Sequence, residues 1–169
     1  MKKLVLMGPP GSGKGTQAAY IIKKYAIPHV SSGDILRHEL KISSDLGKKV
    51  KSYMDKGEIG PEKLITETVL SYLQKKCTQG FLLDGFPRTH FQAKELSKIY
   101  DIDLALLLFV SDDEVVKRIT GRRICDSCGA IFHIETNPPE NDTCFCGGRI
   151  YQRSDDTEET VRNRLDVYN

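Results

Sequence analysis

The sequence contains no hydrophobic run of the roughly 20 apolar residues that a membrane-spanning helix requires. Its hydrophobic N-terminal stretch, Leu4 to Met7, is also too short for the core of a secretory signal peptide, which takes about seven residues or more. We therefore expect a protein of the cytoplasm, where thiols stay reduced.

The chain also lacks a large excess of either charge. Its 25 lysine and arginine residues nearly balance 23 aspartate and glutamate residues, for a net charge of +2. This balance is not that of a protein that coats nucleic acid, so we expect neither a nucleic-acid nor a membrane partner. The arginines are nevertheless concentrated in the last third of the chain, and the guanidinium group suits the binding of phosphate oxygens.

A glycine-rich segment from Gly8 to Thr16 lies between a hydrophobic run and a helical pattern. Strand, loop and helix in this order are typical of a phosphate-binding loop, whose backbone N–H groups surround an anion at a helix N-terminus. Lys14 can reach the outer phosphates of a nucleoside triphosphate, and Thr16 can approach a phosphate or a metal-bound water. The alternative is an ordinary turn rich in glycine and proline. The context favours nucleotide binding.

Hydrophobic strand patterns alternate with helical patterns over most of the chain, which predicts an α/β fold with a parallel sheet flanked by helices. The apolar run from Leu104 to Val110 does not alternate with polar residues and predicts a strand covered on both faces. Ser32, Ser44 and Asp156 are expected to cap helices. The expected helices cover 14–25, 33–40, 45–56, 61–77, 89–99, 112–120 and 157–169.

The segment from Gly121 to Asp156 breaks this alternation and holds four of the five cysteines. It predicts an inserted, β-rich knuckle. Reduced thiols close together favour metal ligation over disulfides, and a structural Zn²⁺ site with four thiolates is the leading interpretation. Free thiols are the alternative, and Asp142 and His133 are spare candidate ligands. The predicted zinc ligands are Cys125, Cys128, Cys144 and Cys146.

Asp84 ends a buried hydrophobic run and is followed by Gly85, a place where α/β sheets bind ligands. A carboxylate there is suited to hold Mg²⁺ through water, with a structural hydrogen bond as the alternative. Arg88 offers a bidentate donor for phosphate. Gln92, one helical turn later, offers an amide for reading a base edge, although glutamines are commonly mere surface residues.

Four segments together resemble the signature segments of the adenylate kinase family, in that family's order: Gly8–Thr16, Ser32–Arg37, Asp84–Thr89 and Asp155–Arg164. The resemblance extends along the whole chain. It implies a zinc-bearing, long-lid nucleoside monophosphate kinase that converts ATP and AMP into two ADP with Mg²⁺, as a monomer. It also implies a P-loop NTPase-type sheet with a helical AMP-binding insert and a small β-rich zinc-knuckle lid.

The resemblance divides the chain into three parts: a core (1–31, 61–120 and 157–169), an AMP-binding insert (32–60) and a lid (121–156). The insert and the lid are expected to close over the two nucleotides. Enzymes of this kind usually continue for several tens of residues, so the resemblance also implies a chain shortened at its C-terminus.

Individual roles follow from the same resemblance. The implied catalytic residues are Lys14, Asp84, Arg88, Arg122, Arg153 and Arg164. The implied ATP-binding residues are Pro10, Gly11, Ser12, Gly13, Lys14, Gly15, Thr16, Arg122, Ile131 and Phe132. The implied AMP-binding residues are Ser32, Arg37, Glu58, Ile59, Gly60, Gly85, Phe86, Pro87, Arg88, Gln92, Arg153 and Arg164.

Three other functions fit the sequence less well. A zinc-knuckle nucleic-acid-binding protein with a P-loop would need a basic stripe with exposed aromatic residues, and the knuckle has only Phe132, Phe145 and Tyr151. A P-loop GTPase would need an Asn-Lys-x-Asp motif, which is absent from the sequence. A UMP/CMP or GMP kinase is the closest rival, and the long insert and Gln92 favour adenylate by resemblance.

Overall fold

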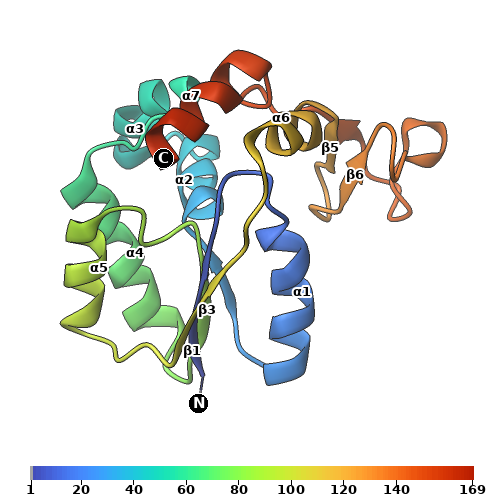
Figure 1. The fold of residues 1–169 in the computed structure, drawn as a ribbon. Coiled ribbons are helices and arrows are strands. Elements are labelled where there is room, and N and C mark those ends of the chain that lie inside the picture. The colour runs from blue at the N-terminus through green and yellow to red at the C-terminus, as the bar shows by residue number, and fades with distance from the viewer. Residues whose placement is uncertain (1) are drawn as a thin grey trace.

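Four short strands form one parallel sheet in the computed structural model, which describes residues 2–169 (Figure 1). The strands are β1 (Lys3–Met7), β2 (His29–Ser31), β3 (Phe81–Asp84) and β4 (Leu104–Leu107). They lie in the order β2-β3-β1-β4. Because all four run in the same direction, their carboxyl ends meet at one edge, where sheets of this kind bind ligands.

The α-helices described between residues 2 and 169 cover the sheet and build its upper end in Figure 1: α1 (Lys14–Tyr25), α2 (Ser32–Lys41), α3 (Asp45–Lys56), α4 (Glu62–Lys76), α5 (His90–Ser97), α6 (Asp112–Thr120) and α7 (Glu158–Tyr168). Successive side chains of a strand point to opposite faces of the sheet. Leu4 and Leu6 of β1 accordingly pack with α1, whereas Val5 packs in the cluster that includes α4 and α5. The predicted α/β architecture is confirmed.

A second, antiparallel sheet lies beyond α6. Its central strand β5 (Arg122–Cys125) pairs with β6 (Ile131–His133) and β7 (Ile150–Tyr151), and a short 3₁₀-helix, η1 (Glu140–Asp142), lies between β6 and β7. The chain leaves the core after α6 and returns before α7, and these two helices pack together through buried valine, isoleucine and leucine side chains. The predicted β-rich insert is therefore present.

The prediction of a fully covered strand from Leu104 to Val110 was wrong. The strand β4 ends at Leu107 and lies at an edge of the sheet, paired with β1. Leu107 is 64% exposed and Phe109 is 90% exposed in the described chain. An unbroken apolar run is typical of a central parallel strand, but the strand order places this run where one side has no neighbouring strand.

The cap predicted at Ser44 was right, and the caps predicted at Ser32 and Asp156 were wrong. Ser44 caps α3 by accepting a backbone hydrogen bond from Gly47. Ser31, instead of Ser32, caps α2, because the Ser32 hydroxyl donates to the carbonyl of Gly85 at 2.6 Å. Asp156 does not cap α7, a role taken by Thr157, because the Asp156 carboxylate binds an arginine described below.

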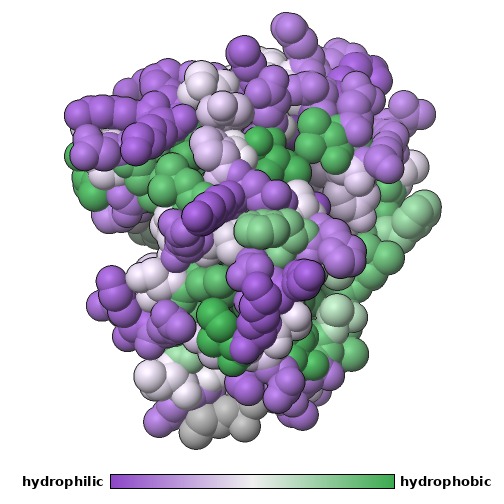
Figure 2. Space-filling view, turned by 90° about the vertical axis from the view of Figure 1, so that its left-hand side faces the viewer, coloured by the Kyte–Doolittle hydropathy of each residue, from purple (hydrophilic) through white to green (hydrophobic). Residues whose placement is uncertain are grey.

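The surface shown in Figure 2 carries polar residues over most of its area, with apolar residues in patches between them. Within residues 2–169, no helix combines the length and the hydrophobicity needed to cross a lipid bilayer.

Candidate active site

The predicted phosphate-binding loop connects β1 to α1. Gly8, Gly11 and Gly13 have positive φ angles of 139°, 71° and 92°, a conformation that residues with a side chain rarely adopt. A Cβ atom on Gly8 would also lie 2.4 Å from the carbonyl oxygen of Leu108. The loop therefore needs glycine, and it brings backbone N–H groups to the N-terminus of α1, where an anion is favoured.

The side chain of Lys14 lies across this loop. Its Nζ donates to the carbonyl oxygens of Gly8 at 2.9 Å and Pro9 at 2.8 Å. Burial lowers the pKa of Lys14 to about 8, with Asp84 opposing the shift and the charges of Arg88 and Arg122 adding to it. Residues far apart in the sequence therefore place their charges around one amine.

Asp84 lies at the carboxyl end of β3, beside Leu6 of β1 and Ser31 of β2. The Nε2 atom of His29 lies 3.4 Å from a carboxylate oxygen of Asp84 and has no hydrogen-bond partner among residues 2–169. Sequence reasoning missed His29, because none of the histidines belongs to a motif. The pairing of β2 with β3 is the signal that would have linked His29 to Asp84, since it brings the two strands side by side.

A pocket lies between α2, α3, the loop before α4 and the start of α5. All the predicted AMP-binding residues except Pro87 and Arg153 belong to its wall. The side chain of Arg88 donates to the carbonyl of Gly85 at 2.7 Å, which turns it back over the loop that follows β3. The pocket is lined by Ser32, Gly33, Leu36, Arg37, Val50, Met54, Gly57, Glu58, Ile59, Gly60, Ile65, Gly85, Phe86, Arg88, Gln92 and Arg164.

Gln92 is held in a defined orientation at the wall of this pocket. It is 1% exposed, so it is not the surface residue considered as the alternative. Its Oε1 accepts a hydrogen bond from the backbone N–H of Arg88 at 2.7 Å. Thr89 caps α5 by accepting from the Gln92 backbone, and the Thr89 hydroxyl donates to the carboxylate of Glu62. The backbone of Arg88 therefore orients the Gln92 amide, and the start of the helix that carries Gln92 is joined to α4 through Thr89 and Glu62.

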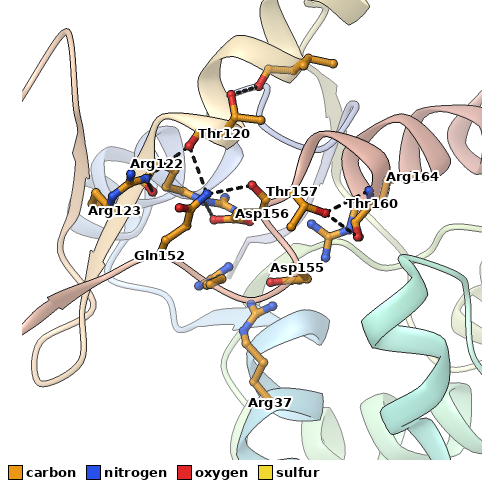
Figure 3. A network of polar contacts seen from close by, with 12 residues as sticks. Arg37, Thr120, Arg122, Arg123, Gln152, Asp155, Asp156, Thr157, Thr160 and Arg164 are labelled. Atoms are coloured by element: carbon orange, nitrogen blue, oxygen red, sulfur yellow. Dashed lines mark hydrogen bonds and ion pairs between the residues drawn. The ribbon is translucent and has the colours of Figure 1, made fainter.

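Arginines from three different elements, Arg37 of α2, Arg122 of β5 and Arg164 of α7, gather in one region (Figure 3). Burial and the nearby Arg164 lower the pKa of Arg88, with Asp84 opposing them. Burial likewise lowers the pKa of Arg153, as do the charges of Arg37 and Arg122, and the buried Nε of Arg153 has no hydrogen-bond partner in the described chain. Buried like charges are unfavourable without counter-ions. The cluster is therefore suited to bind a polyanion.

Carboxylates partly balance this cluster. Arg37 pairs with Asp34 at 2.6 Å, and Arg164 pairs with Asp155. Burial raises the pKa of Asp155, but the charges of Arg164, Arg37 and Arg153 and a hydrogen bond from Arg164 outweigh it and hold this pKa below its usual range. Figure 3 shows Arg37 pointing from α2 toward the segment that contains Asp155.

The strands of the lid begin at an ion pair. Arg122 donates from Nε and Nη2 to the two carboxylate oxygens of Asp156, at 2.8 and 2.5 Å. Asp156 is fully buried. Ile131 of β6 reaches toward the phosphate-binding loop, since a Cβ on Gly15 would lie 3.9 Å from its Cδ1 atom. Phe132 instead contacts Phe145 within the lid, with ring centroids 6.3 Å apart.

The four lid cysteines converge although they are separated in sequence. Their sulfur atoms all lie within 4.8 Å of one another, with 3.5 Å between Cys125 and Cys146 and 3.6 Å between Cys128 and Cys144. In a tetrahedral Zn²⁺ site with Zn–S bonds of about 2.3 Å, neighbouring sulfurs are about 3.8 Å apart. The donor set therefore fits zinc.

The thiolate is the form that binds a metal, and the thiols differ in how far they favour it, since burial raises the pKa of Cys144 to about 12. The backbone N–H of Cys128 is the main reason that the pKa of Cys125 falls to about 6. The spare candidates are not part of the cluster found among residues 2–169. His133 instead lies by the carbonyl of Lys117, 3.3 Å from its Nε2, and accepts backbone hydrogen bonds at Nδ1.

Comparison with known proteins agrees with this geometry. The family model described as "Adenylate kinase" matches residues 6–169. The chain is 51% identical over 174 residues to the adenylate kinase of Caldicellulosiruptor bescii, covering 98% of this chain and 81% of that protein. The adenylate kinases of Alkaliphilus oremlandii and Clostridium perfringens strain SM101 match at 49% and 51% identity with the same coverage. The chain therefore belongs to the adenylate kinase family.

Proposed function

We propose that the chain is an ATP:AMP phosphotransferase that reversibly converts ATP and AMP into two ADP. The single observation that carries this proposal is the nearness of two anion sites. Lys14 of the phosphate-binding loop and Arg88 of the neighbouring pocket lie close enough for the charge of Arg88 to lower the pKa of Lys14. Two phosphate groups bound at these residues would face each other across the end of β3.

The reaction needs positioning and charge stabilisation more than acid–base chemistry. The phosphate of AMP is already an anionic nucleophile, so it needs no general base. In our proposal Arg37 and Arg88 hold it, while Lys14 and the loop N–H groups hold the phosphates of ATP. Mg²⁺, held through water by Asp84, would supply further positive charge to the ATP phosphates.

Three more arginines complete the site in this proposal. Arg122 contacts ATP from the lid, and Arg153 and Arg164 bridge the two phosphate chains. Their nearness to Lys14 and Arg37 supports these roles. Stabilising developing charge in a site without water is the largest contribution that such groups make to catalysis.

Gln92 is proposed to select the base of the acceptor. Its Oε1 already accepts from Arg88, which directs the amide N–H₂ group as a donor toward the pocket. Adenine offers an acceptor nitrogen at its N1 position, whereas guanine has an N–H donor there. Two donors facing each other are unfavourable, so we infer that AMP is preferred over GMP.

The insert (32–60) and the lid (121–156) are proposed to close over AMP and ATP, exclude water and open again for release. Lid closure in adenylate kinase is a known example of this type of motion. The chain enters the antiparallel lid sheet after α6 and leaves it before α7, and this pair of neighbouring connections supports movement as a unit. Zn²⁺ on the four cysteines would keep the lid ordered. We also propose that the protein is a monomer of the cytoplasm.

A coupled assay of ADP formation tests the function directly. ATP is offered with AMP, GMP, CMP or UMP in separate reactions, and AMP is expected to be the preferred acceptor. Preference for another monophosphate would assign the chain to a different acceptor within the same chemistry. The absence of transfer to any of the four would overturn the proposal.

A further inference from the structure

Gln152 joins the two places where the chain enters and leaves the lid. Its Nε2 donates to the carbonyl of Thr120 at 3.2 Å and to the carbonyl of Asp156 at 3.0 Å (Figure 3). Thr120 is the last residue of α6, and Asp156 precedes the N-cap of α7. One side-chain amide therefore uses both of its N–H groups to connect segments that are 36 residues apart in the chain.

The contact with Thr120 satisfies an open end of a helix. The last carbonyls of an α-helix have no partner within the helix. At the end of α6 the lid supplies them for Thr120, whose carbonyl accepts hydrogen bonds from Gln152 and Arg123. Hydrogen bonds from the lid therefore reach the C-terminal end of α6.

The contact with Asp156 leads to the site. The backbone carbonyl of Asp156 accepts from Gln152, while its buried carboxylate holds both donor groups of Arg122. Arg122 is also the second residue after Thr120. Gln152 therefore holds both the backbone near Arg122 and the backbone of the residue that holds the Arg122 guanidinium.

We infer that Gln152 is a positioning residue for Arg122, acting through Thr120 and Asp156 to set where this arginine lies relative to the phosphates of ATP. The inference rests on the proposed role of Arg122 in binding ATP. Gln152 itself does not reach the nucleotide in this account, so its loss affects the ATP side of the reaction and spares the AMP pocket.

Two variants test the inference. Gln152→Glu keeps the shape of the side chain but replaces both donors with acceptors, and Gln152→Ala removes the donors without adding charge. Gln74→Glu, at an exposed position on α4, is the matched control for the added charge. We expect both Gln152 variants to raise the KM for ATP about tenfold, as two lost neutral hydrogen bonds would. The KM for AMP in both Gln152 variants, and both KM values in Gln74→Glu, should stay within about twofold of wild type.

The measurements separate positioning from a general loss of folding. Metal content should match wild type, thermal melting should fall by only about a few degrees because two hydrogen bonds are lost, and calorimetry with ATP should repeat the KM result without turnover. Equal increases in the KM for ATP and for AMP would overturn the inference, as would wild-type behaviour of Gln152→Ala. If the wild-type protein binds ATP but transfers no phosphate, the proposed function fails instead, and ATP calorimetry of the variants still decides the role of Gln152.

Discussion

The core and the lid are held together by different means. In the core, Phe81, Leu82 and Leu83 of β3 are completely buried, and apolar side chains from α1, α4 and α5 pack on both faces of the sheet. In the lid, the buried apolar residues are Ile124, Cys125 and Cys144, whereas Phe145 is 85% exposed. The lid therefore depends on its cysteine cluster and on polar contacts at its base rather than on an apolar core of its own.

The largest loss of catalytic activity is expected from a substitution in the core. Lys14→Met should lower kcat/KM by about 100-fold or more, because it removes a charge that stabilises the transferring phosphate. Steady-state kinetics measure the effect. Circular dichroism should be unchanged, and Lys23→Met, an exposed lysine on the same helix, is the matched control. Near-normal turnover in Lys14→Met would remove Lys14 from the site.

Removal of the metal should affect the lid and leave the core folded. Chelation or Cys128→Ser should disorder the lid, because structural zinc in small peptides contributes about 10–16 kcal/mol and the lid has few buried residues to replace it. Metal analysis is expected to find one zinc per chain. ATP affinity should fall while the core keeps its cooperative melting.

Thiol alkylation provides the internal control for that experiment. Cys77 is buried in the core and should stay unreactive before and after chelation, whereas the four lid thiols should become reactive only after it. Free reaction of four thiols in the untreated protein, with no zinc bound, would show that the lid is held by packing alone.

A substitution of Gln92, in the core, should affect AMP and ATP differently. Gln92→Ala should raise the KM for AMP about tenfold and leave the KM for ATP nearly unchanged, since base-reading hydrogen bonds are worth about 1–3 kcal/mol in nucleic-acid recognition. The Gln152 variants, in the lid, are expected to raise the KM for ATP and to leave the KM for AMP nearly unchanged. An equal change in both constants for Gln92→Ala would mean that this residue acts on the fold.

The smallest expected effect is a pH dependence at Lys14. Burial lowers its pKa from 10.5 to about 8, so the free protein loses the charge of Lys14 as the pH rises through 8. Bound phosphate favours the charged form, and ATP affinity should therefore fall a few-fold between pH 7.5 and 8.5, up to about tenfold per pH unit above that. Calorimetry measures this fall, and Lys14→Arg, which stays charged, should lack it.

The same shift has a defined sign for stability. Between pH 8 and 10.5 the unfolded chain binds more protons at Lys14 than the folded chain does. The contribution of Lys14 to the free energy of unfolding therefore rises with pH over that window. The Lys14→Met variant should lack this contribution, and denaturant titrations at several pH values would detect a contrary sign.

Much of the core follows from local patterns. The glycines of the loop from Gly8 to Thr16 are required by positive φ angles, a constraint that each residue carries by itself. The hydrophobic runs and helical patterns predicted the strand from Phe81 to Asp84 and the helix α3 with its Ser44 cap. The cysteine spacing predicted the cluster that the structure brings together.

Other features depend on residues that meet only after folding. The same apolar pattern suits a central or an edge strand, so the place of β4 at the sheet edge came from the strand order. Asp156 could cap a helix or bind Arg122, and the burial of its carboxylate decided the outcome, because an unpaired charge in that position is costly.

By itself, the sequence determined the phosphate-binding loop, the alternation of strands and helices, the four thiols and the family, because each depends on residues close in the chain or on their order along it. Only the tertiary structure decided the partners of His29 and Asp84, the orientation of Gln92 by Arg88, and the connection that Gln152 makes across the base of the lid. These contacts depend on how whole elements pack, and a side chain with several possible partners takes the one that packing brings within hydrogen-bond distance.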